Sequence, residues 1–517
     1  MKRTIIMLGV VLFATWNVTA QPTQRPDDQA AAKTNVEAVS MPKSEQSVTQ
    51  HKIVIGGTTI NYMATAGTLI VRDAKDQPYA SMGYIAYTKN DVLDPSRRPI
   101  TFAYNGGPGS SSIWLHMGAL GPKRIVTAAA AVTPPPPYKV VDNDSSILDR
   151  TDIVMIDPVG TGFSRAIGEA KDKDFWGVDP DIESVSRFIK QYVTENGRWN
   201  SPKYLLGESY GTVRSAGVVD YLQTMEYMSF NGVILVSMAT DLELPAADFF
   251  LGSQRSWPFV LPTYTAVAWY HKVLPDSPAE LEPLLREVRT FALGEYAHGL
   301  VLGSDLPDAD RKALIGKLHR YTGLTPDYLD KADLRVTMPQ FSKELLRVRR
   351  ETVGQLDARF LGVGFNPLGE KAEYDPMDAA ITPAFIAAFQ DYLRRDLSFD
   401  KGSTYKPDAN VWKTWDYRHK VEGSEIPQPM VNTGVDLAHA MGFNPNLRVL
   451  VLQGIFDLGT PLLATEYMVS HLGLREDLRS HIEIKYYEAG HMMYLHEPSL
   501  KKFKGNIAAF IDATDRF

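Results

Sequence analysis

Residues 207–211 read Gly207-Glu208-Ser209-Tyr210-Gly211, and this stretch decides the fold. It follows the apolar run 204–206, which predicts a strand, and it precedes a segment whose pattern predicts a helix. A serine on a tight strand-to-helix turn is held in a strained backbone conformation, and a glycine two residues to either side lets neighbouring backbone approach it. The pattern alone is common in long chains, so its interpretation depends on the residues that accompany it.

A serine hydroxyl attacks only when a base takes its proton, and a third group must orient that base. In chains with this turn, the acid and then the histidine follow the serine, each after a strand. The run 447–452 predicts a buried strand leading to Asp457, and 482–487 predicts a strand leading to His491. Taken singly, such an aspartate is more often a helix cap and such a histidine more often structural. Because both recur in the required order, Ser209, Asp457 and His491 are the predicted catalytic residues.

A glycine-rich run, Asn105-Gly106-Gly107-Pro108-Gly109, follows another predicted strand at residues 100–104. Acyl transfer needs two N–H donors aimed at the developing oxyanion, one from the residue after the nucleophile and one from a loop after an earlier strand. We expect the backbone N–H groups of Tyr210 and Gly107 to supply them. Without the serine motif, the same run would be interpreted as an ordinary turn.

Together these motifs resemble those of the serine carboxypeptidase family (peptidase family S10), and the chain resembles a bacterial member of that family. The matching pieces, in order, are 105–109 with the serines that follow, 157–164, 207–211, Asp457 and 489–492, and the resemblance spans roughly residues 80–515. It implies an α/β-hydrolase fold with a mixed, mostly parallel sheet and a helical cap insertion. It also implies a peptide substrate with a free C-terminus, whose terminal residues are released through an acyl-enzyme.

Carried over by residue, the resemblance makes Ser209 the nucleophile, His491 the general base and acid, and Asp457 the group that orients the histidine. It makes Asn105 and Glu208 the holders of the substrate's terminal carboxylate. The predicted substrate-binding set, taken from the matching motifs, is Asn105, Gly106, Glu208 and Met492.

Two positions depart from the family pattern. Ala103 stands where the family commonly has tryptophan, and Ala119 stands near a second glutamate that would share a proton with the one before the nucleophile. Without that partner, Glu208 is either ionised, and repels a terminal carboxylate, or kept protonated by burial. The sequence leaves both alternatives open. We expect carboxypeptidase activity with a weaker preference for acid than is typical of the family.

The N-terminus predicts export. Lys2 and Arg3 precede an apolar stretch and small residues near position 20, so residues 1–20 are predicted to be a signal peptide. A membrane anchor is the alternative, but the apolar core is shorter than a membrane-spanning helix requires. Residues 21–50 have the composition of a disordered leader. The chain has no cysteine, so it forms no disulfide, and we expect a periplasmic or secreted protein.

The remaining pattern predicts a core at 51–245 and 433–517 that begins with antiparallel segments at 59–64, 68–72 and 80–87. Between the two parts, residues 246–432 are predicted to form a helical cap over the active site, or else a helical region that packs on the sheet. Helix-spaced apolar residues mark three segments there: 279–293, 308–322 and 383–397.

Other chemistries find little support. The net charge is −7, and the one compact basic cluster, at Arg347, Arg349 and Arg350, is predicted to be a solvated helix face, so nucleic-acid binding is not expected. No metal-ligand motif occurs, and we expect no metal and no cofactor. A serine esterase or acyltransferase on the same triad, and a catalytically silent binding protein of this fold, remain as alternatives. Substrate side-chain preference and oligomeric state cannot be read from the sequence.

Overall fold

The computed structural model describes residues 43–244, 256–276, 278–399, 402 and 404–515. The chain divides into two compact units, Met1–Met41 and Pro42–Phe517, and the description concerns the second. The predicted signal peptide and most of the predicted leader therefore lie outside the described residues.

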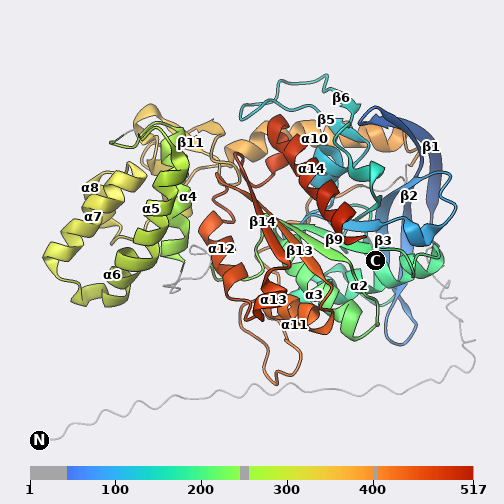
Figure 1. The fold of residues 1–517 in the computed structure, drawn as a ribbon. Coiled ribbons are helices and arrows are strands. Elements are labelled where there is room, and N and C mark those ends of the chain that lie inside the picture. The colour runs from blue at the N-terminus through green and yellow to red at the C-terminus, as the bar shows by residue number, and fades with distance from the viewer. Residues whose placement is uncertain (1–42, 245–255, 277, 400–401, 403, 516–517) are drawn as a thin grey trace, which may run out of the picture. The chain divides into compact units, whose positions relative to one another are not determined.

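A ten-stranded sheet forms the core of the fold (Figure 1). Its first strands pair antiparallel, and from β7 through β4, β9, β10, β13 and β14 every pairing is parallel. The short β8 pairs with β3. The prediction of a mixed, mostly parallel sheet is confirmed. In spatial order the strands are β1 (Gln46–Ile55), β2 (Thr58–Arg72), β3 (Pro78–Lys89), β7 (Asp152–Ile156), β4 (Ile100–Tyr104), β9 (Lys203–Glu208), β10 (Gly232–Val236), β13 (Arg448–Gly454) and β14 (Ile482–Tyr487), with β8 at Arg165–Ala166.

The strands near the N-terminus correct two predictions. The segments 59–64 and 68–72 belong to one continuous strand, β2. β1 begins at Gln46, so residues 46–50, assigned to the leader, are strand instead. This part of β1 is polar and mostly exposed, and the β2 backbone pairs with it along its whole length. Composition does not reveal such a strand because the partner's hydrogen bonds, not burial of its own side chains, hold it.

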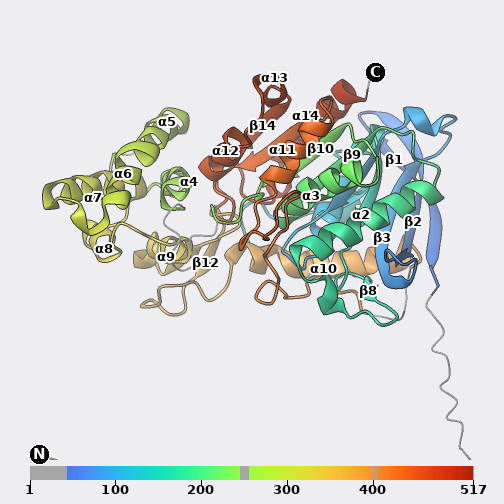
Figure 2. The same cartoon turned by 90° about the horizontal axis from the view of Figure 1, so that it is seen from below.

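Helices cover both faces of the sheet (Figures 1 and 2). Apolar residues of α2 (Val178–Glu195), α3 (Tyr210–Thr224) and α11 (Gly434–Phe443) join one buried cluster. Those of α10 (Pro376–Arg395) and α14 (Glu497–Thr514) join the other. β9 shows the alternation that feeds both layers, because Leu205 enters the first cluster whereas Tyr204 and Leu206 enter the second.

A helical insertion, which we define as residues 256–353, follows the first part of the core. It lies beside α12 (Leu462–Ser470), where the rings of Phe259 and Tyr467 are 4.6 Å apart and Leu462 N–H donates to Thr263 Oγ1 at 3.2 Å. The predicted helix 308–322 coincides with α7. The prediction at 279–293 corresponds to α5 and the π-helical turn after it. The helices are α4 (Trp257–Tyr270), α5 (Leu281–Phe291), α6 (Ala297–Leu302), α7 (Asp308–Thr322), α8 (Pro326–Lys331) and α9 (Met338–Glu344).

Two features of the predicted cap differ from expectation. The helix expected at 383–397 begins earlier, as α10 at Pro376, where the Asp375 carboxylate caps the Met377 N–H at 2.8 Å, and it packs into the core beside the sheet. The basic cluster forms a 3₁₀ turn, Arg347–Arg349, and Arg350 adopts a left-handed conformation with φ of 56°, so it is not a helix face. The packing of α10 into the core depends on contacts with distant segments, which local patterns do not contain.

Short elements complete the described chain. They are α1 (Ile113–Leu115), β5 (Lys123–Ile125), β6 (Val140–Asp142), β11 (Glu351–Val353), β12 (Leu361–Val363) and α13 (Glu476–Arg479), besides short 3₁₀ and π turns. Among the described residues, no helix combines the length and the apolar character that crossing a membrane requires.

Candidate active site

Ser209 occupies the turn between β9 and α3, with φ of 61° and ψ of −128°. A non-glycine residue with positive φ in this region is strained, and such strain concentrates at functional sites. The turn is held by the Ser209 N–H, which donates to Val236 O at 2.9 Å, and by close backbone approach. A Cβ at Gly207 would lie 2.1 Å from Gly211 O, so position 207 requires glycine, and a Cβ at Gly211 would lie 3.0 Å from Tyr104 O.

Asp457 and His491 are joined by a hydrogen bond of 2.7 Å between Oδ2 and Nδ1. The other carboxylate oxygen of Asp457 accepts from the N–H groups of Gly459 at 2.9 Å and Thr460 at 3.0 Å. Asp457 is fully buried, and His491 is 4% exposed. This pairing leaves Nε2 as the imidazole nitrogen available to a substrate or nucleophile.

The parallel strands bring the three predicted catalytic residues to one edge of the sheet. Ser209 follows β9, Asp457 follows β13 and His491 follows β14, and β10 lies between β9 and β13. Ser237, just after β10, bridges the strands by donating from its Oγ to His491 O at 2.8 Å. Carboxyl ends of neighbouring parallel strands form the usual crevice for ligands in such sheets.

A segment that sequence reasoning placed in the cap supports this edge. Residues 355–359 run between the loops that carry Asp457 and His491: Gln355 O accepts from Leu458 N–H at 3.1 Å, and Leu356 O accepts from His491 N–H at 2.7 Å. The Asp357 carboxylate accepts from Gly490 N–H at 3.1 Å and is paired with Arg359. No local motif marks this segment, because its role depends on contacts more than a hundred residues away in the chain.

The glycine-rich loop lies against the serine turn. A Cβ at Gly106 would lie 2.4 Å from Tyr210 N, and Gly107 has φ of +105°. The loop is covered by residues 407–411, where Ala409 N–H donates to Gly109 O at 2.8 Å. Among the described residues, the N–H groups of Gly107 and Tyr210 donate no hydrogen bond, so both remain available to a ligand.

Asn105 and Glu208 form a buried pair directly beside Ser209. Asn105 Nδ2 donates to Glu208 Oε1 at 3.0 Å, and Asn105 Oδ1 accepts from Leu115 N–H at 3.0 Å, which fixes the orientation of the amide. Burial raises the pKa of Glu208 to about 7, although His491 opposes the shift. Of the two alternatives left by the sequence, the structure favours the second, in which burial keeps Glu208 protonated in acid and partly so at neutral pH.

His491 has a raised pKa. Burial by itself lowers the pKa of this imidazole, but the contact with Asp457, together with the charges of Glu208 and Asp375, outweighs burial and stabilises the charged form. Glu208 acts in the same direction when ionised. The histidine is therefore a stronger base than an isolated imidazole.

A buried ion pair beneath the turn was not found from the sequence. Arg214 Nε donates to Asp181 Oδ2 at 2.8 Å, and its Nη1 donates to Asn105 O at 2.8 Å. The guanidinium carbon lies 5.0 Å from the ring centre of Tyr104 and 5.5 Å from that of Tyr210. The pair links α2, α3 and the glycine-rich loop, and a charged residue in a helix carries no signal that it points inward.

The other predicted or questioned positions are buried. Met492 is 5% exposed and begins the 3₁₀ turn Met493–Leu495 directly after His491. Ala103 lies in β4, and Ala119 lies in the π turn His116–Leu120. Both join the cluster on the α10 face of the sheet, as Met492 does.

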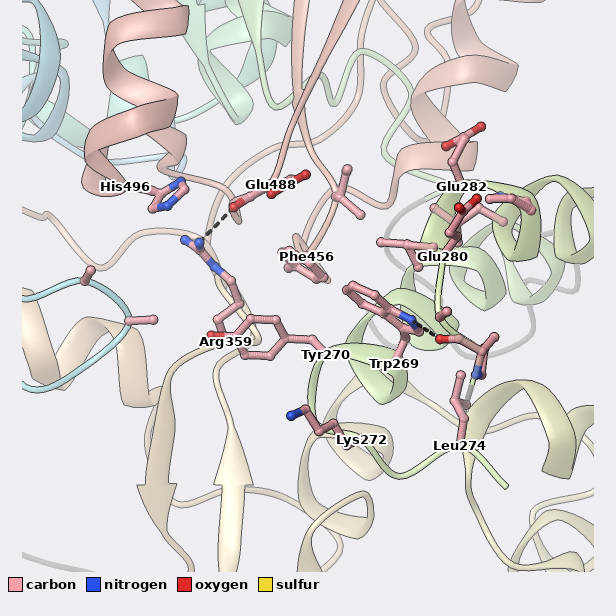
Figure 3. Close-up of a pocket in the computed structure, with 18 residues that line it drawn as sticks. Trp269, Tyr270, Lys272, Leu274, Glu280, Glu282, Arg359, Phe456, Glu488 and His496 are labelled. Atoms are coloured by element: carbon pink, nitrogen blue, oxygen red, sulfur yellow. Dashed lines mark hydrogen bonds between the residues drawn. The ribbon is translucent and has the colours of Figure 1, made fainter. Parts of the chain in front are cut away.

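A cavity of about 1080 Å³ lies next to this edge, between the helical insertion and the loops after β13 and β14 (Figure 3). Trp269 and Tyr270 face it from α4, Phe456 from the loop before Asp457, and Arg359 and His496 from the core side. Arg359 Nη1 donates to Glu488 O at 2.8 Å across one wall. Ser209, Asp457 and His491 do not line this cavity, so it is separate from the triad.

Metal ligation does not coincide with the predicted site. In the part of the chain that the structure describes, the one group with suitable spacing is Asp220, Glu422 and His439, and none of them is a predicted site residue. His439 Nδ1 already lies 2.9 Å from the Asp220 carboxylate.

Comparisons with known proteins show which families and structures this chain resembles. Residues 58–230 match the family model of the serine carboxypeptidases, peptidase family S10. The pheromone-processing carboxypeptidase KEX1 of Saccharomyces cerevisiae is 29% identical over 189 residues, which are 34% of this chain and 25% of that protein. The crystal structure of KEX1ΔP, a prohormone-processing carboxypeptidase from the same organism, has a TM-score of 0.51 at 14% identity and covers 87% of this chain and 92% of that one.

The fold is that of the α/β-hydrolases, and the prediction of this fold is confirmed. The resemblance to the serine carboxypeptidase family is also confirmed. The matched segment contains Asn105, Gly107, Glu208 and Ser209 and ends before Asp457 and His491. The chain spans about a quarter of the length of the curated relatives that it matches.

Proposed function

We propose that this chain is a serine-type carboxypeptidase that releases C-terminal residues from peptides. The observation that carries the proposal is the buried Asn105–Glu208 pair directly before Ser209, whose amide and raised pKa suit a neighbouring carboxylate group. A protonated carboxyl group donates a hydrogen bond to a carboxylate, whereas an ionised one repels it. A substrate with a free C-terminus would thus be placed with its last peptide bond at Ser209.

The proposed chemistry has two stages. In the first, His491 Nε2 takes the proton of Ser209 Oγ as this oxygen attacks the last peptide carbonyl, and then gives the proton to the leaving amine, which departs as a free amino acid. In the second, water loses a proton to His491 and attacks the acyl-enzyme, and the proton returns to Ser209. Asp457 holds Nδ1 protonated throughout and stabilises the imidazolium.

The N–H groups of Gly107 and Tyr210 stabilise the charge that develops on the carbonyl oxygen in both stages. They are free of internal hydrogen bonds, and each lies in backbone fixed by close packing against the other's loop. Donors held in place before reaction cost no reorganisation when charge appears. Gly106 serves this arrangement through its missing side chain, and Met492 contributes the wall beside His491.

Mass-spectrometric analysis of a peptide library tests the proposal. Wild-type protein is expected to shorten peptides from the C-terminus one residue at a time, while Ser209→Ala leaves them intact and fails to react with a fluorophosphonate probe. As a control, Ser470→Ala changes an exposed serine of α12 and should behave as wild type. Trimming from the N-terminus, or hydrolysis of esters without loss of C-terminal residues, would contradict the carboxypeptidase and favour the esterase or acyltransferase alternative.

We also infer that the protein is exported, from the predicted signal peptide at residues 1–20. Expression of the whole chain in a bacterial host should give a product that begins at Gln21 and is found outside the cytoplasm. N-terminal sequencing of the periplasmic and medium fractions checks this. A product that retains Met1 in the cytoplasm would contradict it.

A further inference from the structure

Tyr494 brings a hydroxyl group to the Asn105–Glu208 pair from a different part of the chain. It lies three residues after His491, in the 3₁₀ turn Met493–Leu495, and is 3% exposed. Its hydroxyl interacts with the Glu208 carboxyl and with the Asn105 side chain. Thus three polar side chains converge beside Ser209, although only two of them belong to recognisable motifs.

Two polar atoms in this group have no hydrogen bond of regular geometry. Among the described residues, Tyr494 Oη and Glu208 Oε2 are both buried and both without such a partner. A buried polar group without a hydrogen bond costs free energy. Two such atoms, Tyr494 Oη and Glu208 Oε2, at the same site therefore require an explanation. A bound carboxylate provides one, because its two oxygens accept from the phenol, from a protonated Glu208 and from the Asn105 amide.

Packing holds the Tyr494 ring in the position that brings its hydroxyl to the Asn105–Glu208 pair. A Cβ at Gly118 would lie 2.5 Å from Tyr494 Cε2, so the ring uses the space that a side chain at position 118 would take. On another side the ring packs against Phe503, with centres 6.1 Å apart.

We propose that the Tyr494 hydroxyl, together with Asn105 and Glu208, binds the terminal carboxylate of the substrate. This inference rests on the proposed function of the same site. A phenol differs from a second carboxyl group because it remains a neutral donor without sharing a proton. Burial also raises the pKa of Tyr494 well above its usual range, so the donor persists at every working pH.

Binding measurements in the Ser209→Ala protein test the proposal, because no turnover interferes. Calorimetry gives the Kd of an N-acetylated dipeptide with a free C-terminus and of the same dipeptide as its C-terminal amide. We expect the acid to bind more tightly. In Ser209→Ala/Tyr494→Phe, the preference for the acid should fall about tenfold or more, as expected for loss of one hydrogen bond to a charged group.

Tyr487→Phe is the matched control. Tyr487 is also a buried tyrosine that packs against Phe503, at 6.5 Å, but its hydroxyl accepts from Asn506 Nδ2 at 2.6 Å, away from the site. Its loss should leave the acid-to-amide ratio unchanged. Tyr494→Phe keeps the ring, so its thermal midpoint should stay within a few degrees of the parent, and the measured change then reports the hydroxyl.

An unchanged acid-to-amide ratio in Tyr494→Phe would overturn the proposal, and so would a parent protein that binds acid and amide equally. Failure of the proposed function has a different signature, namely wild-type protein that releases no C-terminal residues. The Ser209→Ala parent could prefer the acid and the Tyr494→Phe variant lose that preference, while the wild type releases no C-terminal residues. This combination would support the carboxylate site and assign it to another reaction. In the active enzyme, Tyr494→Phe should raise KM for peptide acids while kcat changes little.

Discussion

The active-site edge of the sheet and the helical insertion differ in how closely their backbones are packed. We define the active-site edge as residues 105–112, 207–211, 454–460 and 489–496. A Cβ added at Gly207 or Gly454 there would lie 2.1 Å from a backbone oxygen, whereas at Gly294 or Gly316 of the insertion it would meet nothing within 4 Å. Backbone contact therefore excludes a side chain at these two positions of the edge, whereas these two positions of the insertion have room for one; Gly323 of the insertion, where a Cβ would lie 2.7 Å from Val273 O, is an exception.

The two regions also differ in how deeply their ion pairs are buried. Arg214, beneath the active-site edge, is fully buried with Asp181, while Arg320 of α7 forms ion pairs with Asp276 and Glu287 in which all three side chains are largely exposed. Removing one partner of a buried pair leaves an uncompensated charge, whereas water replaces an exposed partner. The comparison shows why recognisable motifs occur at the edge and why the insertion has few of them.

The largest expected effect belongs to Asp457→Asn, which tests whether the edge acts through a fixed imidazole. The N–H groups of Gly459 and Thr460 keep the amide oxygen of the asparagine on their side, so its NH2 group faces Nδ1 and donates to it. His491 then adopts the wrong tautomer, and kcat should fall about 10⁴-fold. Steady-state kinetics on a blocked dipeptide measure the change. Asp477→Asn, at an exposed aspartate paired with Arg475, is the control and should leave kcat unchanged. A loss below about tenfold would remove Asp457 from the mechanism.

The next effect is on stability and compares the two ion-pair types. Arg214→Met keeps the volume of the side chain but leaves Asp181 buried without its partner, so the free energy of unfolding should fall by about 3–5 kcal/mol. Arg320→Met should cost about 0–1 kcal/mol. Urea unfolding of both variants gives the two values. Equal losses would show that burial does not separate these pairs.

Replacing a glycine by alanine should lower the stability of the protein at the active-site edge and raise it in the insertion. Gly106→Ala places a Cβ 2.4 Å from Tyr210 N and should destabilise the protein by about 1–3 kcal/mol. Gly316→Ala, at an exposed position inside α7, should instead stabilise it by about 0.5–1 kcal/mol because alanine favours the helix. Thermal midpoints measured side by side provide the check, and a stabilising Gly106→Ala would contradict the close packing described for the edge.

The smallest expected effect is a pH dependence confined to the active-site edge. Burial raises the pKa of Glu208 to about 7, so below this pH the carboxyl is protonated and donates to a substrate carboxylate, and above it the group is ionised and repels one. The ratio of kcat/KM for a peptide acid to that for its ester should therefore be highest in acid and fall up to about tenfold per pH unit above 7.

Two variants isolate this dependence. Glu208→Gln should make the ratio independent of pH, because the amide remains a donor throughout. Glu287→Gln removes an exposed carboxylate of the insertion, whose pKa is lowered by Tyr321 and Arg320, and should leave the wild-type profile in place. A ratio that is flat from pH 5 to pH 9 in the wild type would show that Glu208 does not face the substrate carboxylate.

The sequence by itself determined the strands that lead to Asn105, Ser209, Asp457 and His491, and with them the mixed sheet of the α/β-hydrolase fold. It did so because each of these residues ends a buried strand in a turn that only a few residue types can form. It also placed α7, whose periodicity is local.

The tertiary structure alone decided what surrounds these residues. The support of the His491 loop by Leu356, the buried Arg214–Asp181 pair, the pKa of Glu208 and the approach of Tyr494 all join segments far apart in the chain. A local pattern records which residues can form a turn or a helix, but burial and long-range contact set the charge of a carboxyl group and the partner of a hydroxyl group. Those quantities exist only once the sheet has brought the distant segments together.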